Sequence, residues 1–262
     1  MNKTTYTIAA LCSLCLLSSI GAVMAIKEGF VHTVYPLQNS VTLDGKWTSP
    51  AEWTDANQTS ISANVAFRTK WGPFVDTENV PQYFLVEVFN DNTANSNDRV
   101  QLCFDGDMSG GATPQTGDLR IDIVGNTNPV VYQGNGTAWT QIDTPPAAQF
   151  QFNSSISDSP TSSTPHWIYE IMINKPSLGL GPQFYGRVAV FAAGSGAGTE
   201  AWPTESGRDI PNDWGDFPYS TEPIPEGLGL AIMILATSVA VIFGSNYLRK
   251  RPKTAILSPT RL

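Results

Sequence analysis

The chain has 262 residues, a formal net charge of −8 and a hydrophobic fraction of 41%. The excess of acidic over basic residues argues against nucleic acid as a partner. Two histidines and three cysteines do not form the clusters that a zinc or metal-hydrolase site requires.

The first 25 residues have the pattern of an export signal. Lys3 gives the positive start, residues 8–20 form a short apolar run, and Val23-Met24-Ala25 offers a small-residue cleavage site. This pattern is typical of a signal peptide that is removed from the mature protein. We therefore expect residues 1–25 to be a signal peptide and the mature chain to begin at Ile26.

The exported part of the chain is strongly acidic. Residues 26–225 contain 22 Asp and Glu against 9 Lys and Arg, a net charge of −13. Cys103 is the one cysteine outside the signal segment, so an intramolecular disulfide is excluded even in an oxidising compartment. The stability of this part must come from packing or from bound ions.

The hydrophobic pattern of the exported part has a period of two residues. In the segment 99–105, for example, Val100, Leu102 and Phe104 alternate with polar residues, which is typical of a half-buried strand. Seven strands are expected on this basis, at residues 83–89, 99–105, 118–123, 129–133, 150–152, 166–173 and 186–192. Many short strands with turn-rich connections predict an all-β fold, an antiparallel β-sandwich over residues 26–205. An irregular closing segment and stalk is expected at residues 206–226.

An Asp-rich loop follows the second expected strand. Asp105-Gly106-Asp107-Met108-Ser109-Gly110 begins like a calcium loop, in which alternating side chains supply hard oxygen ligands and glycine permits a sharp turn. Asp105, Asp107, Ser109 and Asp118 are the expected ligands of a structural calcium. A solvated hairpin loop of turn-forming residues explains the same pattern equally well.

All seven tryptophans lie between residues 47 and 214. An exposed aromatic ring flanked by polar side chains is suited to the apolar face of a sugar. Trp53 and Trp167 lie in patterned segments and are expected to be buried. Trp71, Trp139 and Trp214 lie in turn-like segments, so they are the candidates for ligand binding, although packing under a loop explains each of them singly.

Several segments resemble one known group of domains. VTLDGKWTSPAEWTDA (residues 41–56) is similar to the opening of family 9 carbohydrate-binding modules and of the wider DOMON-like group, and the segment from Tyr83 through GDLRIDI (residues 117–123) is similar to their central strands. HWIYEIMINKPSLGL (residues 166–180) resembles a later strand, with Asn174 and Lys175 in place of the usual proline. The resemblance implies a β-sandwich, and the group that it points to includes sugar binders, haem binders and modules of unknown role.

The end of the chain has the pattern of a membrane anchor. Residues 227–248 carry no charge and are followed by Arg249-Lys250-Arg251. About 20 apolar residues suffice to cross a bilayer, and the basic cluster places the tail, residues 249–262, in the cytoplasm. We expect a single-pass protein whose β-sandwich lies outside the cell. Pro225-Glu226 before the run also resembles the Pro-Glu sorting tails of prokaryotic surface proteins, in which the tail is exchanged for another anchor.

These features favour a surface-anchored binding module without enzymatic activity, with a glycan or cell-envelope polysaccharide as partner. Neither histidine lies in a recognisable nucleophile or base motif. The first alternative is a module that holds haem non-covalently for electron transfer, through residues such as Met108, Met172, His32 and His166. The second alternative is a structural or adhesive envelope protein.

Overall fold

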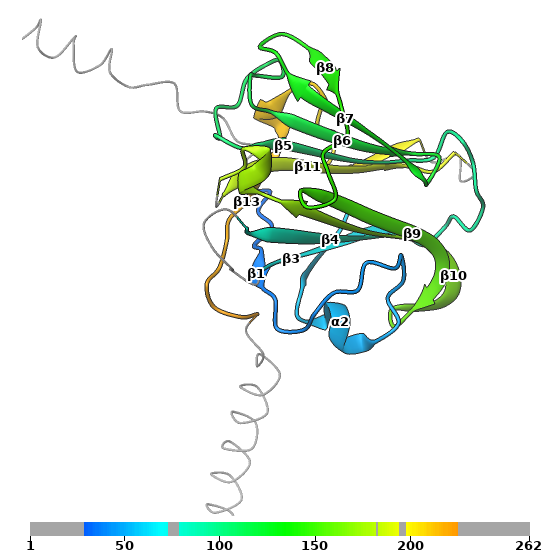
Figure 1. Ribbon diagram of the computed structural model, residues 1–262. Coiled ribbons are helices and arrows are strands. Elements are labelled where there is room, and N and C mark those ends of the chain that lie inside the picture. Colours follow the sequence, from blue (N-terminus) through cyan, green and yellow to red (C-terminus); the bar gives the residue numbers. More distant parts are fainter. Residues whose placement is uncertain (1–28, 73–78, 182, 194–197, 225–262) are drawn as a thin grey trace, which may run out of the picture. The chain divides into compact units, whose positions relative to one another are not determined.

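Two β-sheets pack face to face in this computed structural model, which describes residues 29–72, 79–181, 183–193 and 198–224. Figure 1 shows the sheets as two layers, with β5, β6, β7 and β11 in the upper layer and β3, β4, β9 and β10 in the lower one. The expected all-β sandwich is confirmed. Helix is confined, among the described residues, to α2 (Pro50–Thr54) and to the single-turn 3₁₀ helices η1 (Pro176–Leu178) and η2 (Pro211–Asp213).

The first sheet has six strands in the order β1-β3-β4-β10-β9, with β2 also paired to β3. Its pairs are antiparallel apart from the parallel pair of β1 and β3. The strands are β1 (Tyr35–Pro36), β2 (Asn57–Ser60), β3 (Val65–Trp71), β4 (Pro81–Val88), β9 (Phe150–Ser159) and β10 (Ser162–Asn174).

The second sheet has seven strands in the order β12-β11-β5-β6-β7-β8, with β13 also paired to β11. All of these pairs are antiparallel. The strands are β5 (Arg99–Asp105), β6 (Leu119–Val124), β7 (Asn128–Gly134), β8 (Trp139–Ile142), β11 (Phe184–Phe191), β12 (Thr199–Trp202) and β13 (Gly215–Phe217).

The core lies between the two sheets. Successive side chains of a strand point to opposite faces, and the apolar members of each alternating strand form one cluster, including Phe67, Phe84, Leu102, Ile121, Ile171 and Val188. Trp167 is 8% exposed and belongs to this cluster, so its expected burial is confirmed. Burying a large apolar side chain contributes about 1.5–3 kcal/mol, which lets packing stabilise a domain that has no disulfide.

All seven expected strands are present, but β1, β2, β3, β8, β12 and β13 were not expected, and β3 is the longest of these. Its sequence, VAFRTKW, carries Arg68 and Lys70 at positions that alternate with core residues. Such a pattern usually places the charged face in water. Here a second layer of the chain covers that face, and Lys70 has 0% exposure. The pattern alone therefore did not show that both faces of β3 are covered.

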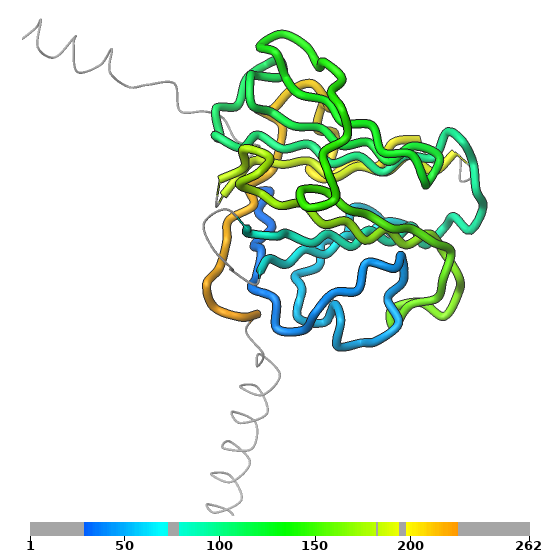
Figure 2. The backbone as a smooth tube through the Cα atoms, in the orientation of Figure 1, coloured from blue at the N-terminus to red at the C-terminus, as the bar shows by residue number. Residues whose placement is uncertain are grey.

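The layer that covers β3 is formed by residues 37–56, which we call the N-terminal cover. Its residues Trp47, Trp53 and Ala56 pack on Leu85 of β4 and Ile168 of β10. Trp53 is fully buried, as expected from the sequence. The cover and α2 lie against the lower layer on the side away from the upper one (Figures 1 and 2).

Glu170 of β10 fixes the turn in the middle of the N-terminal cover. Its carboxylate accepts hydrogen bonds from the backbone N–H groups of Asp44 and Gly45 and from Nε1 of Trp53, at 2.9, 2.9 and 3.0 Å. Gly45 has a φ of +77°, and a Cβ there would lie 2.6 Å from the backbone of Ser154. Only glycine therefore fits this close approach. Burial raises the pKa of Glu170 to about 7.

Lys70 fixes both ends of the same cover. Its ammonium group donates to the backbone carbonyls of Asn39 and Glu52 and, at 2.8 Å, to the carboxylate of Asp55. Burial lowers the pKa of Lys70, and the hydrogen bond to Asp55 opposes that shift. A buried charge is tolerated only when it is paired and hydrogen-bonded. This network thus ties residues 39–55 to β3.

The closing segment differs from its expectation. Residues 206–226 were expected to lie beyond the sandwich, yet β13 pairs with β11 and Val34 bridges to Tyr219. The boundary expected at residue 205 was therefore placed too early. The expected signal peptide, spanning helix and basic tail lie outside the described residues. Within the described residues, no helix is both long and apolar enough to span a membrane.

A buried ion pair joins the far end of β10 to β4. His166 donates from Nε2 to Glu87 at 3.2 Å and from Nδ1 to the carbonyl of Thr164 at 2.8 Å. Both partners are acceptors, so both ring nitrogens carry protons and the imidazole is charged. Burial alone would lower the pKa of His166, but the hydrogen bonds to Glu87 and Thr164 outweigh it and raise the pKa. The pKa of Glu87 is lowered, because hydrogen bonds from His166, Ser159 and Thr161 outweigh its burial.

We predict that this pair makes stability depend on pH. The raised pKa of His166 stabilises the fold below the unfolded value of about 6.5, and the contribution is lost as the pH rises through the folded pKa. Glu87 contributes above about pH 4.5 and loses its contribution at lower pH. The free energy of unfolding of the wild type should exceed that of His166→Gln by about 3 kcal/mol near pH 5.5, and by less above pH 8. Urea denaturation at several pH values measures this difference, and a difference that does not change with pH would contradict the prediction.

Candidate functional site

The outer face of the second sheet is polar. Along β5, Arg99, Gln101, Cys103 and Asp105 alternate with the core residues and therefore point outward. On the neighbouring strands Cys103 is paired with Arg120 of β6 and with Arg187 of β11, and Gln101 is paired with Asp122. Ion-binding and hydrogen-bonding groups thus occupy a face that most sandwiches leave to solvent.

Residues 203–214, which we call the C-terminal cover, close part of this outer face. Trp214 has 0% exposure and packs on Cys103 and Tyr185, and its Nε1 donates to the carbonyl of Gly207 at 3.0 Å. Arg187 donates from Nε to the carbonyl and the hydroxyl of Ser206, at 3.0 and 3.1 Å. The cover is therefore attached to the sheet by one buried ring and one buried guanidinium.

The part of the outer face that stays open is a groove of about 790 Å³, which we call the outer-face groove. Its floor lies on β5 and β11, and its walls come from the loop before β5 and from the C-terminal cover. The polar residues of its lining include Asn97, Arg99, Gln101, Arg187, Arg208 and Asp209. Ala189 and the partly exposed Phe191 supply apolar surface.

Hydrogen bonds fix the side chains on the floor of the outer-face groove. Gln101 accepts a hydrogen bond from Nη1 of Arg187 and donates from Nε2 to Asp122 at 2.8 Å. Asp122 lies 3.4 Å from Nε of Arg120. The Nε atoms of Arg99 and of Arg120 are buried and have no hydrogen-bond partner.

An ion pair between Arg208 and Asp209 lies at the rim of the outer-face groove. Arg208 donates to both oxygens of Asp209, at 2.8 and 2.9 Å. The same carboxylate accepts a hydrogen bond from Nε1 of Trp139 at 2.8 Å. The ion pair with Arg208 lowers the pKa of Asp209, so this carboxylate is charged at neutral pH.

The three tryptophans expected to bind ligand do not form one platform. Trp214 is buried beneath its own segment, so the prediction that it contacts ligand is wrong. Trp139 is half-buried, stacks on Trp214 with ring centroids 6.4 Å apart, and lies 5.3 Å from the guanidinium of Arg120. Trp71 belongs to β3 of the other sheet, where its Nε1 donates to the carbonyl of Ser220 at 3.0 Å. The outer-face groove contains none of the three.

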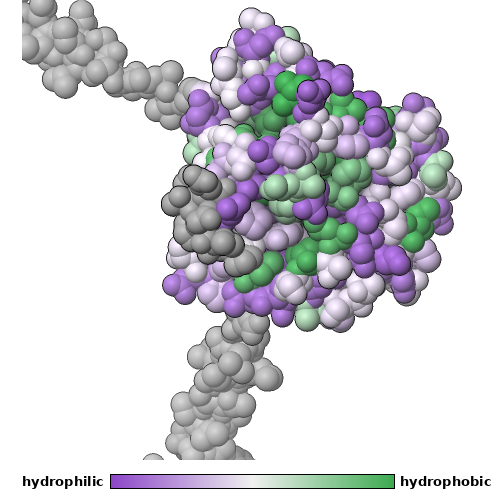
Figure 3. All heavy atoms as spheres, viewed as in Figure 1, coloured by the Kyte–Doolittle hydropathy of each residue, from purple (hydrophilic) through white to green (hydrophobic). Residues whose placement is uncertain are grey.

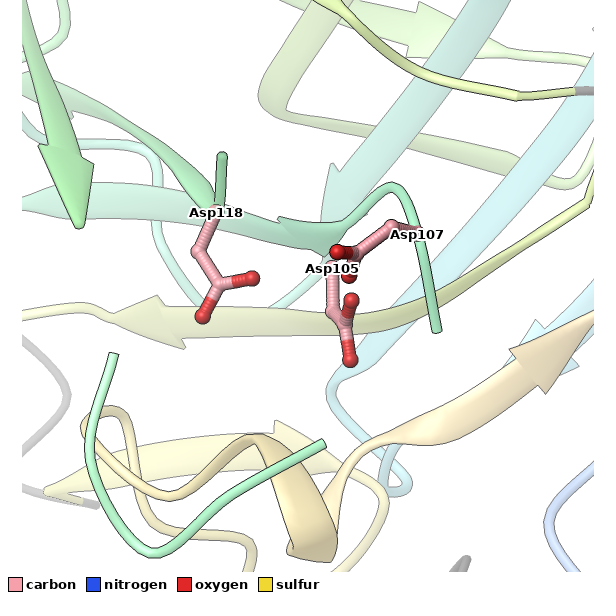
Figure 4. A group of neighbouring side chains, drawn as sticks. All are labelled: Asp105, Asp107 and Asp118. Carbon is pink, nitrogen blue, oxygen red and sulfur yellow. The ribbon is translucent and has the colours of Figure 1, made fainter. Parts of the chain in front are cut away.

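The expected calcium ligands, in contrast, lie together. Oxygen atoms of Asp105, Asp107 and Asp118 all lie within 4.8 Å of one another, and Figure 4 shows the carboxyl groups around one small space between the loop after β5 and the start of β6. Asp105 accepts hydrogen bonds from the backbone N–H groups of Ser109 and Gly110, at 3.1 and 2.7 Å. The fold therefore joins two segments that are separated by ten residues of loop.

Two oxygen atoms of this acidic cluster have no hydrogen-bond partner although they are buried. They are Oδ1 of Asp118 and Oγ of Ser109. Burial raises the pKa of Asp105 to about 6 and that of Asp118 to about 7, and the carboxylates of Asp105 and Asp107 add to the shift at Asp118. Like charges held close together in a buried site disfavour ionisation. A cation between them would remove that repulsion.

Both histidines that were considered as haem ligands are engaged in hydrogen bonds. His32 has 0% exposure, and its two ring nitrogens lie 2.7 Å from the hydroxyls of Thr59 and Thr69. Burial lowers its pKa to about 3, so it is neutral. His166 is paired with Glu87, and Met172, six residues further along β10, lies about 20 Å away by strand geometry. The structure does not bring together a pair of ligands for haem among these residues.

Sequence reasoning did not identify the outer-face groove. The alternation in β5 was noted for its apolar members, whereas the outward members Arg99 and Gln101 carry the polar site. Arg187 lies 86 residues after Gln101 in the chain. The sequence carries no signal that the two side chains are in contact. The one available signal is that arginine is rare between residues 26 and 225, and that three of the five arginines there, Arg99, Arg120 and Arg187, fall within expected strands at outward positions.

No family model and no curated protein matches the chain. Among solved structures, the chain is similar to a carbohydrate binding module family 9 (CBM9) from Caldicellulosiruptor kristjanssonii in complex with glucose, with a TM-score of 0.49 and 18% identity, over 75% of this chain and 99% of that one. A CBM9 from the same organism in complex with cellotriose gives a TM-score of 0.48 and 18% identity, over 76% of this chain and 97% of that one.

Proposed function

We propose that this protein is a non-enzymatic glycan-binding module and that the outer-face groove holds the glycan. The observation that carries the proposal is the lining of the groove, in which planar amide and guanidinium groups of Asn97, Arg99, Gln101 and Arg187 lie on one sheet face. Such groups offer several hydrogen-bond donors and acceptors in fixed directions. Sugar hydroxyls, which both donate and accept, suit them well.

The size and shape of the outer-face groove also fit a glycan. Its volume of about 790 Å³ lies within the range of small-ligand sites, about 300–1,000 Å³. Phe191 adds a partly exposed ring at one edge, against which the apolar face of a sugar could pack. The face seen in Figure 3 is mainly hydrophilic, with small apolar areas between polar ones.

The chemistry of the groove favours binding over catalysis. Guanidinium and amide groups neither take up nor release a proton near neutral pH. Asp209, the carboxylate in the lining, is held ionised by Arg208 and accepts a hydrogen bond from Trp139. A general acid needs the opposite, a raised pKa near the working pH.

The first test fills the groove. Thr199 is exposed on the wall of the outer-face groove, so Thr199→Trp should block it without disturbing the core, and affinity for glycan should fall at least about tenfold because the ligand can no longer reach the floor. A glycan array identifies the ligand with the purified full-length protein, and calorimetry measures the affinity.

Thr140→Trp is the control for this test, because Thr140 is exposed on β8 outside the groove. It should bind like the wild type. Glucose and cellotriose serve as the first soluble probes. A wild-type protein that binds glycans unchanged after Thr199→Trp would place the site elsewhere, and one that binds no glycan would reject the proposed function.

We also propose that Asp105, Asp107, Ser109 and Asp118 hold a structural calcium ion. Calcium takes six to eight oxygen ligands with flexible geometry. The buried, unpartnered oxygens of Asp118 and Ser109 fit this demand, since each would gain a bond that the protein does not supply. The ion would join the loop after β5 to the start of β6.

Calcium should therefore raise the melting temperature. At 100 times the dissociation constant the gain is about 2.7 kcal/mol, or about 5–10 °C for a domain of this size. Asp118→Asn should abolish the calcium-dependent shift, whereas Asp143→Asn, at an exposed position, should retain it. Thermal melts in EDTA and in calcium measure both effects. Melting curves of the wild type that coincide in the two solutions would reject the site.

We further propose that the domain is displayed on the cell surface by a helix at residues 227–248, with the signal peptide at residues 1–25 removed and the basic tail in the cytoplasm. The proposal rests on the two apolar runs and on the charge that follows the second. Added protease should digest the β-sandwich on intact cells and leave an epitope tag at the end of the tail protected. A tag that is digested together with the sandwich contradicts this orientation, and a mature protein that lacks the tag altogether indicates exchange of the tail.

A further inference from the structure

The arginines of this protein are concentrated at one place. Residues 26–225 carry a net charge of −13 and contain only five arginines. Four of them lie on the outer face of the second sheet or on its C-terminal cover, namely Arg99, Arg120, Arg187 and Arg208. An acidic domain thus gathers its guanidinium groups around the outer-face groove.

Two of these four charges are already compensated. Arg208 forms a two-bond ion pair with Asp209 at the rim. Arg120 lies 3.4 Å from Asp122 and has its guanidinium 3.7 Å from the ring centroid of Tyr132. These two arginines therefore need no further anion.

The other two arginines line the groove without a carboxylate partner. The ion pairs among the described residues include neither Arg99 nor Arg187. Arg187 is 5% exposed, and its hydrogen-bond acceptors are the neutral groups of Ser206 and Gln101. The Nε of Arg99 is buried without an acceptor. In the described part of the groove these two guanidinium groups thus have no direct ion pair, and Asp122, which interacts with Arg187, already contacts Arg120.

Leaving charges unpaired in a partly dehydrated site is costly. Burial lowers the pKa of Arg187, which is the sign of that cost. Stability alone would be served as well by neutral side chains. A guanidinium fork is suited to planar, two-bond recognition of an oxyanion, so the cost is explained if an anionic ligand binds here.

We propose that the outer-face groove selects glycans that carry an anionic group, either a carboxylate or a sulfate ester, and that Arg99 and Arg187 bind this group. The inference rests on the proposed function, because it names the class of glycan for the same site. Gln101 lies between the two arginines, bonded to Arg187 on β11 and two residues along β5 from Arg99. It orients Arg187, while Arg99 remains free to approach the ligand.

The test uses paired glycans on one array, with the purified full-length protein. Each uronic-acid oligosaccharide is printed beside its carboxyl-reduced form, and each sulfated oligosaccharide beside its desulfated form. We expect the anionic member of at least one pair to bind at least about tenfold more tightly than its neutral counterpart, with an affinity that falls as salt is added. The pair that shows the preference identifies the anion as carboxylate or sulfate.

Arg99→Gln then assigns the preference to the groove. The glutamine removes the charge but keeps a hydrogen-bond donor, and Arg99 has no partner whose loss would disturb the fold. Binding of the anionic glycan should weaken at least about tenfold, and by a larger factor than binding of its neutral counterpart. Lys46→Gln is the matched control, since it removes the same charge from an exposed site on the N-terminal cover.

Three results would overturn the inference, and they can be told apart. If neutral glycans bind as tightly as their anionic counterparts, the charge preference is rejected while the proposed function stands. If the preference exists but survives Arg99→Gln unchanged, the anion is bound elsewhere. If no glycan of either kind binds, the proposed function fails and the inference fails with it.

Discussion

Each sheet of a two-layer sandwich has two faces, and only one of them can be buried against the other sheet. In this protein the two outer faces carry charged or polar residues in their middle strands. Each outer face is therefore covered by a segment of the same chain. The N-terminal cover supplies one for the first sheet, through Lys70 and Glu170. The C-terminal cover supplies the other through Trp214 and Arg187. The outer-face groove follows from this arrangement. The C-terminal cover is incomplete, and the part of the second sheet that it leaves open is the groove.

The distribution of tryptophan reflects the same constraint. Trp47 and Trp53 belong to the N-terminal cover, Trp214 to the C-terminal cover, and Trp167 and Trp202 to the core between the sheets. A large ring buries much apolar area and has one N–H group that can bond to a nearby acceptor. These rings therefore hold layers together, and the part of the second sheet that its cover leaves open presents polar groups. Abundant tryptophan in an exported β-sandwich is accordingly weak support for an aromatic binding platform.

The sequence predicted the strands and the acidic cluster for the same reason: both depend on short-range patterns. Val100, Leu102 and Phe104 report the buried face of β5 by alternation, and Asp105 to Gly110 form one continuous loop. The groove could not be predicted in this way, since it depends on the register that sets Cys103 beside Arg187 and on a cover that begins only at residue 203, far along the chain from β5. β3 was missed because its outer residues Arg68 and Lys70 look solvent-exposed until residues 37–56 are placed over them. Long-range covering of a face leaves no local pattern to read.

Cys103 gives the fold an internal reporter. Its thiol lies on the outer face of β5 against Trp214, and burial raises its pKa to about 12. An alkylating reagent reacts with the thiolate, so it can label this residue only in molecules whose C-terminal cover has lifted from the sheet. The labelling rate, compared with the rate of global unfolding, would separate local opening of one wall of the groove from loss of the whole sandwich. In the part of the chain that the structure describes, Cys103 is the one cysteine, so its labelling reports how firmly the groove is held.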